Sequence, residues 1–195
     1  MPLIRLPRPS RTTVMWAVAG LIAGGIVHIL AVLATPKLYG GETVTRISSA
    51  TPLNQMIALP PIDPDTMVFP FMSPDIRYAL CRYDLSGGPL SLRTTLLDTT
   101  WTIALYDSQG RNFYAVSGRD LQRRDVEIVL APSEDGGSAG VPLSRDTPAS
   151  SITVSVRDPR GIAVVEAPLN GSSYASEAAS ALALSTCAIR ERQRL

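Results

Sequence analysis

The chain has 195 residues, a formal net charge of +1, 45% hydrophobic residues, two cysteines and one histidine. Arg5, Arg8 and Arg11 precede a long apolar stretch, so taking their three charges from +1 leaves −2 for the remainder. This near-neutral remainder lacks the strongly basic face that binds nucleic acid, and we expect no nucleic-acid partner.

Residues 14–34 form an apolar stretch of 21 residues without Asp, Glu, Lys or Arg. A helix of this length spans about 30 Å, the thickness of the hydrocarbon core of a bilayer. We predict a transmembrane helix, with the lipid bilayer as its partner, after a cytoplasmic tail over residues 1–13. Pro36 is expected to end the helix. The alternative is a cleaved signal peptide with its cleavage site at Val32-Leu33-Ala34, although the stretch exceeds the usual length of about 7–15 residues.

The arginines before the stretch place the N-terminus in the cytoplasm by the positive-inside bias, so we expect the main domain outside the cytoplasm. Cys81 and Cys187 then lie on the side where disulfides persist. A bridge between them would close a loop of about 100 residues and add up to roughly 4–5 kcal/mol of stability. Two buried free thiols are the alternative.

The predicted membrane helix carries Gly20, Gly24 and His28 at spacings of four, which places them on one face. Glycines at this spacing allow a second helix to approach closely in lipid. The alternatives are ordinary membrane glycines with His28 near the outer interface, or a metal or haem ligand. A single histidine needs a partner to supply further ligands, so we predict no metal and no cofactor.

Residues 35–76 form a proline-rich connector. One short helix is expected between Glu42 and Leu59, followed by an extended proline run. The apolar residues of this run, Met67 to Met72, are expected to lie on the domain; if exposed, they would form a partner-binding strip.

Residues 77–195 are predicted to form the main domain, in which short segments of period two are separated by turn signals. The resulting fold class is mainly β, an antiparallel sandwich or barrel. Asp158–Gly161 is expected to close a hairpin. The seven predicted strands are Tyr78–Asp84, Leu90–Thr95, Trp101–Tyr106, Asn112–Val116, Asp125–Leu130, Ile152–Arg157 and Ile162–Ala167.

After the predicted strands, residues 174–190 are rich in Ala, Ser and Leu and are expected to form a helix. Its N-cap is expected at Ser172 or Ser173, because serine accepts hydrogen bonds from free helical N–H groups. Its apolar face suits packing on the sheet.

The only histidine lies in the apolar stretch, which excludes a Ser-His-Asp or Cys-His arrangement in the main domain. Four polar residues remain as candidates, and two interpretations are open for them. Either they cap turns and pair with one another, or they bind a small polar or anionic ligand with the arginine as the fork. These residues are Arg82, Asp84, Asp107 and Asn112.

Four blocks of sequence resemble the family catalogued as Domain of Unknown Function 1254, and more closely its short membrane-anchored form from alphaproteobacteria. The blocks are GGIVH (24–28), YALCRYDLSGGPLSLR (78–93), WTIALYDSQGRNFYAV (101–116) and VEIVLAP (126–132). Longer members of the family join this domain to a second β-rich domain. The resemblance implies that a separate membrane-anchored protein supplies that second domain to the short form.

These observations predict a single-pass protein of the bacterial inner membrane with a periplasmic β domain. We expect a non-enzymatic interaction or assembly subunit, whose partner carries the second β-rich domain. The alternative is a small-ligand-binding or hydrolytic domain that acts together with that partner.

Overall fold

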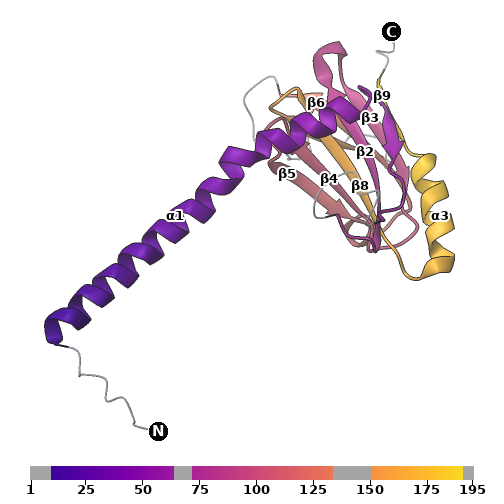
Figure 1. Cartoon of the computed structure of the whole chain (residues 1–195). Helices are drawn as coiled ribbons and strands as arrows, with labels where there is room; N and C mark the ends of the chain where they lie inside the picture. Colours follow the sequence, from indigo (N-terminus) through magenta and orange to yellow (C-terminus); the bar gives the residue numbers. More distant parts are fainter. Residues whose placement is uncertain (1–9, 64–71, 134–150, 191–195) are drawn as a thin grey trace. The chain divides into compact units, whose positions relative to one another are not determined.

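The computed structural model describes residues 10–63, 72–133 and 151–190 (Figure 1). Three predicted features lie outside these ranges: most of the cytoplasmic tail, the apolar proline run from residue 64 to 71, and the loop after residue 133. The chain divides into two compact units, Met1–Gly40 and Gly41–Leu195.

The first helix, α1, covers Arg11–Ala50. Ser10 caps its start, since the Ser10 hydroxyl accepts a hydrogen bond from the backbone N–H of Thr13 at 3.1 Å. The large apolar side chains of its first half are exposed, among them Trp16 at 70% and Leu21 at 77%.

The predicted end at Pro36 is wrong, because α1 continues to Ala50. A proline inside a helix lacks the N–H that would bond to the carbonyl four residues earlier. The turns on either side keep their bonds, so this penalty of about 3 kcal/mol need not end the helix. The short helix expected between Glu42 and Leu59 is likewise absorbed into α1, and the chain then turns into a strand.

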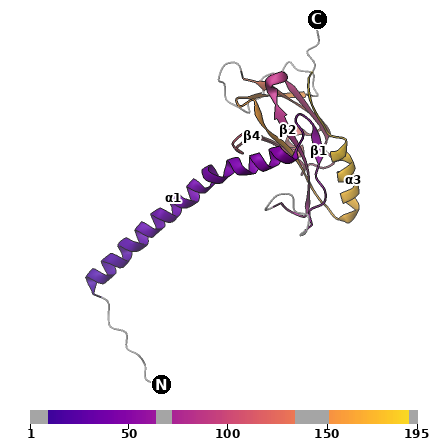
Figure 2. The same ribbon diagram turned by 45° about the horizontal axis from the view of Figure 1, so that its top comes forward.

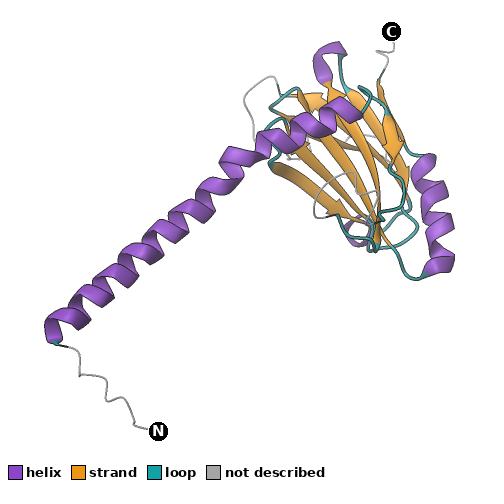
Figure 3. Cartoon of the chain, viewed as in Figure 1, coloured by secondary structure: helices purple, strands orange, loops and turns teal. Residues whose placement is uncertain are grey.

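Within the described ranges, nine strands form two sheets, drawn in orange in Figure 3. The first sheet has the order β1-β2-β8-β4-β5 and the second β7-β6-β3-β9. The strands are β1 (Met56–Ala58), β2 (Ile76–Asp84), β3 (Leu90–Thr95), β4 (Thr102–Asp107), β5 (Asn112–Ser117), β6 (Asp125–Pro132), β7 (Ser151–Val156), β8 (Arg160–Pro168) and β9 (Thr186–Ile189). Two short helical segments, η1 (Leu85–Gly87) and α2 (Gly118–Leu121), lie between strands.

The mainly β class and all seven predicted strands are confirmed. The two unpredicted strands, β1 and β9, are only three and four residues long, too short for a period-two pattern. The last helix, α3 (Ser172–Ala183), ends well before the predicted Arg190, because β9 forms from the residues that follow. Its N-cap is Gly171, not Ser172 or Ser173. The helix packs beside β1 and β2 (Figure 2).

The predicted hairpin at Asp158–Gly161 is wrong. The turn joins β7 in the second sheet to β8 in the first, so the chain crosses from one sheet to the other instead of folding back on itself. The β7 strand pairs parallel to β6, so the second sheet is mixed. A turn sequence specifies a local reversal of the chain and not the strand with which each side pairs.

The core lies between the two sheets. Trp101, Tyr83 and a set of leucines and isoleucines from both sheets are fully buried there. The indole N–H of Trp101 donates to the hydroxyl of Tyr174 at 2.9 Å, which ties α3 to the domain. A disulfide joins Cys81 on β2 to Cys187 on β9, with their Cα atoms 6.4 Å apart. It therefore links the two sheets covalently.

Gly161 on β8 has no room for a side chain. A Cβ atom there would collide with the carbonyl oxygen of Tyr106 and the phenol of Tyr83. The Tyr83 hydroxyl fills this space and donates to the Tyr106 carbonyl at 3.1 Å. Burial raises the pKa of Tyr83, so the hydroxyl stays protonated as a donor.

Replacing both Cys81 and Cys187 by alanine is expected to lower the free energy of unfolding by about 3–5 kcal/mol. The reason is that the bridge spans 106 residues and restricts the unfolded chain. Urea unfolding followed by tryptophan fluorescence measures the change. A reductant should lower the urea midpoint of the wild-type protein and leave that of the double variant unchanged. Equal urea midpoints for the oxidised wild-type protein and the double variant would contradict the expectation.

Glu166 on β8 lies opposite Tyr78 and Thr102 on the neighbouring strands, and burial raises the pKa of its carboxyl above the ordinary value of 4.5. The ionised carboxylate therefore destabilises the folded state. This destabilisation is complete above the pKa that Glu166 has in the folded state, and it is absent below the pKa that Glu166 has in the unfolded state. Glu166→Gln should raise the thermal midpoint by about 1–3 °C at pH 7.

That gain should vanish as the pH falls to about 4, where Glu166 is protonated in both states. Thermal unfolding between pH 4 and pH 8 measures the trend. Glu177→Gln, at an exposed glutamate of α3, is the matched control and should show no such gain. A destabilised Glu166→Gln protein at pH 7 would refute the argument.

Candidate functional site

Two of the four candidate residues, Arg82 and Asp84, line one cavity at the end of β2. The cavity measures about 450 Å³. It is also lined by residues of β8 and of the turn after β4, and by a leucine that follows α1. These further residues are Leu53, Tyr83, Ser108, Arg160 and Gly161.

The strand register explains why these residues meet. Asp84 pairs directly with Arg160 across β2 and β8, and Arg82 lies two residues earlier on the same face of the sheet. On the other side of β2, Leu53 forms an isolated bridge with Arg82. The Asn54 side chain accepts from the Asp84 N–H at 2.8 Å and donates to the Asp84 carbonyl at 3.2 Å. This wall of the cavity is therefore fixed by hydrogen bonds.

Asp84 also caps the helical segment η1. Its carboxylate accepts from the backbone N–H of Ser86 at 2.9 Å and from the Ser86 hydroxyl. These hydrogen bonds lower the pKa of Asp84, with a smaller contribution from the nearby guanidinium groups of Arg160 and Arg82. The carboxylate is thus ionised and already engaged.

Asp107 and Asn112 are not among the residues that line this cavity. The buried Asp107 carboxylate accepts from the backbone N–H groups of Gln109 and Arg111, both at 2.9 Å, and pairs with the Arg111 guanidinium at 2.7 Å. Asn112 is exposed and donates to the Tyr114 carbonyl at 3.3 Å. The structure gives both residues contacts within the β4–β5 hairpin.

A second acidic residue lies near the cavity. The Asp158 carboxylate accepts from the backbone and hydroxyl of Ser108 and, at 3.1 Å, from the backbone N–H of Arg160. Although burial opposes the shift, these bonds lower the pKa of Asp158. Asp158 therefore joins the turn before β8 to the turn after β4.

The sequence reasoning missed Arg160 and Ser108 as cavity residues. Both belong to segments that it treated as turns, and only the pairing of β2 with β8 brings Arg160 beside Arg82. An arginine two residues before the predicted strand Ile162–Ala167 was the available signal. It identifies no partner without the strand order.

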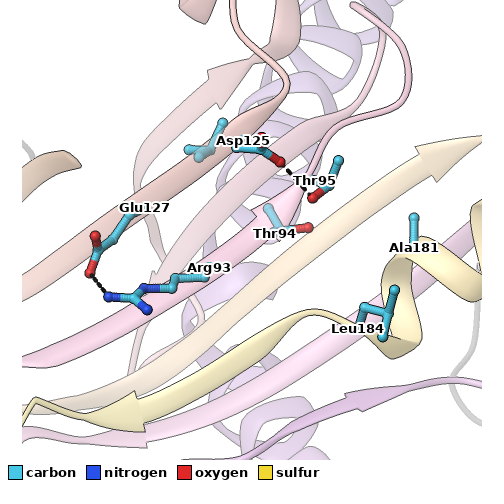
Figure 4. Close-up of a pocket in the computed structure, with 8 residues that line it drawn as sticks. Arg93, Thr94, Thr95, Asp125, Glu127, Ala181 and Leu184 are labelled. Carbon is cyan, nitrogen blue, oxygen red and sulfur yellow. Dashed lines mark hydrogen bonds and ion pairs between the residues drawn. The ribbon is translucent and has the colours of Figure 1, made fainter. Parts of the chain in front are cut away.

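A different cavity, of about 310 Å³, lies between β3, β6 and the end of α3 (Figure 4). Its polar side chains are paired with one another. Arg93 binds Glu127 at 3.1 Å, and Thr95 donates to Asp125 at 2.8 Å. The Thr94 and Ser185 hydroxyls, which are buried, lie 2.8 Å apart. Bonds from Ser91 and Arg93 lower the pKa of Glu127 against the effect of burial.

Among the described residues, no group of three or more His, Cys, Asp and Glu side chains is placed to hold a metal ion. His28 lies in α1 and its side chain is exposed. Gly20 and Gly24 are open: a Cβ atom at either would meet nothing within 4 Å. The apolar part of α1, Arg11–Thr35, is long and apolar enough to cross a membrane, with a mean hydropathy of 2.3, a property that signal sequences share.

Two solved structures resemble the fold. The VPA0106 protein from Vibrio parahaemolyticus aligns with a TM-score of 0.53 and 16% identity over 83% of this chain and 40% of its own. A putative uncharacterized protein from Burkholderia cenocepacia aligns with a TM-score of 0.48 and 12% identity over 84% of this chain and 43% of its own. The chain thus spans less than half the length of either, and the first likeness supports the fold alone.

No curated protein matches the sequence. The family resemblance, in contrast, is confirmed. The profile of the family described as "Protein of unknown function (DUF1254)" matches residues 53–182, more than half of the chain, and the chain therefore belongs to that family.

Proposed function

We propose that this protein is a short, membrane-anchored member of the family that acts as a non-enzymatic interaction or assembly subunit. One observation carries the proposal: the apolar side chains of the first half of α1 are exposed all around the helix. A helix that is apolar on every side is stable in lipid or against another apolar helix. In water this surface would favour aggregation.

The orientation follows from charge and from redox chemistry. Arg5, Arg8 and Arg11 precede the apolar stretch and favour an N-terminus in the cytoplasm. The Cys81–Cys187 disulfide supports a β domain on the other side, where thiols are oxidised. For a bacterial protein this arrangement corresponds to the inner membrane, with the β domain in the periplasm.

The partner that we propose is a membrane-anchored protein carrying the second β-rich domain of longer family members. Gly20, Gly24 and His28 share one face of α1, and the open space at both glycines lets a second helix approach closely. The imidazole on the same face would then be covered by protein instead of acyl chains.

We expect the full-length chain to stay in the membrane pellet after a carbonate wash, because the apolar helix is retained. Immunoblotting of pellet and supernatant with a C-terminal tag measures the distribution. A C-terminal fragment found entirely in the supernatant, shortened by the first 34 residues, would identify a cleaved signal peptide and overturn the anchor.

The double variant Gly20→Leu/Gly24→Leu should reduce recovery of the partner by about tenfold or more after cross-linking in native membranes, since leucines at both positions block close approach. Mass spectrometry identifies whether the captured protein carries the second β-rich domain. Gly25→Leu is the matched control, because Gly25 is equally open but lies about 100° around the helix from Gly24. Equal recovery from all three proteins would reject this helix face.

A further inference from the structure

The cavity beside β2 and β8 carries more positive than negative charge. Its lining includes two guanidinium groups, Arg82 and Arg160, and one carboxylate, Asp84. In antiparallel strands, diagonal neighbours on one face lie about 7–8 Å apart, within reach of long side chains. Arg82 and Arg160 hold such diagonal positions, since Asp84 pairs with Arg160. One small ligand can therefore contact both groups.

The nearby carboxylates accept hydrogen bonds from backbone N–H groups and from serine hydroxyls. Asp84 accepts two bonds from Ser86, and Asp158 accepts bonds from Ser108 and from the main chain of Arg160. Within the part of the chain that the structure describes, the Arg160 guanidinium forms no ion pair with either carboxylate.

The remaining walls of the cavity suit a small organic molecule. Leu53 is 48% exposed and offers an apolar surface, while Tyr83 and Gly161 form a closely packed floor. The volume of about 450 Å³ lies within the range of about 300–1,000 Å³ for small-molecule sites. The hydrogen bonds of Asn54 and Asp158 hold the walls in place without a ligand.

We propose that this cavity binds the carboxylate or phosphate group of a small anionic molecule, with Arg160 and Arg82 as the donors. A guanidinium presents parallel N–H groups that match the two oxygens of such an anion, and these charge-assisted bonds are among the strongest. The site is separate from the glycine face of α1. The test of anion binding is therefore independent of the test of the proposed helix association.

The cavity of Figure 4 gives the matched comparison. Its arginine, Arg93, forms an ion pair with Glu127 at 3.1 Å, whereas within the described residues Arg160 forms none with Asp84 or Asp158. An exposed ion pair of this kind contributes little to stability, and Arg93→Gln should fold normally.

The test uses the full chain in nanodiscs of phosphatidylcholine. Thermal unfolding is measured with increasing inorganic phosphate or succinate, against sodium chloride at the same ionic strength. We expect a saturable rise of the midpoint with at least one of the two anions, because a ligand that binds the folded state stabilises it. Arg160→Gln should weaken the apparent affinity about tenfold or more, Arg160→Lys less, and Arg93→Gln not at all.

The absence of a saturable rise beyond chloride for both anions would overturn the proposal. So would an Arg160→Gln protein that is folded by circular dichroism and binds as tightly as the wild type. If Arg160→Gln does not fold, Arg82→Gln and Arg160→Lys provide the same comparison. Repeating the titration with phosphatidylglycerol in the nanodiscs distinguishes the sources: a weaker response to added anion assigns the site to a lipid headgroup, and an unchanged one to a soluble ligand.

Discussion

Burial of one core between two sheets is the constraint on which the rest of the domain depends. The core draws on both sheets and on α3 through residues such as Tyr83, Leu92 and Leu182. The Cys81–Cys187 disulfide ties β2 of the first sheet to the short edge strand β9 of the second. A strand of four residues makes few hydrogen bonds of its own, so the covalent link holds this edge and the end of α3 against the core.

The candidate anion site is a consequence of the same packing. Gly161 lacks a side chain because the phenol of Tyr83 occupies that space, and the register of β2 with β8 places Arg82, Asp84 and Arg160 on the opposite face. The turns around the cavity are then closed by Asp84 and Asp158. Asp84 and Asp158 thus stabilise the turns beside the cavity, and Arg82 and Arg160 line it. Turn capping, one of the two interpretations posed for these polar residues, describes the contacts of Asp84 and Asp107, while ligand binding is a proposal.

Sequence patterns predicted the local structure well where the signal was long. Strands of six residues or more have a readable period, and seven of them were found, whereas β1 and β9 are too short to show one. The helix predicted up to Arg190 was overextended, because β9 contains the β-branched residues Thr186 and Ile189, which favour strands, and pairs with β3. Of the candidate site, Arg82 and Asp84 were identified, while Arg160 and Ser108 required knowledge of which strands are neighbours.

The sequence by itself determined the apolar character of residues 14–34, the mainly β class of the domain and the lack of histidine chemistry in it. These properties depend on composition and on local periodicity, which a linear chain displays directly. Only the tertiary structure decided that the turn at Asp158 crosses between sheets, that β6 and β7 run parallel, and that two arginines 78 residues apart share one cavity. Strand pairing is set by long-range burial and register, and a local pattern carries no information about its distant partner.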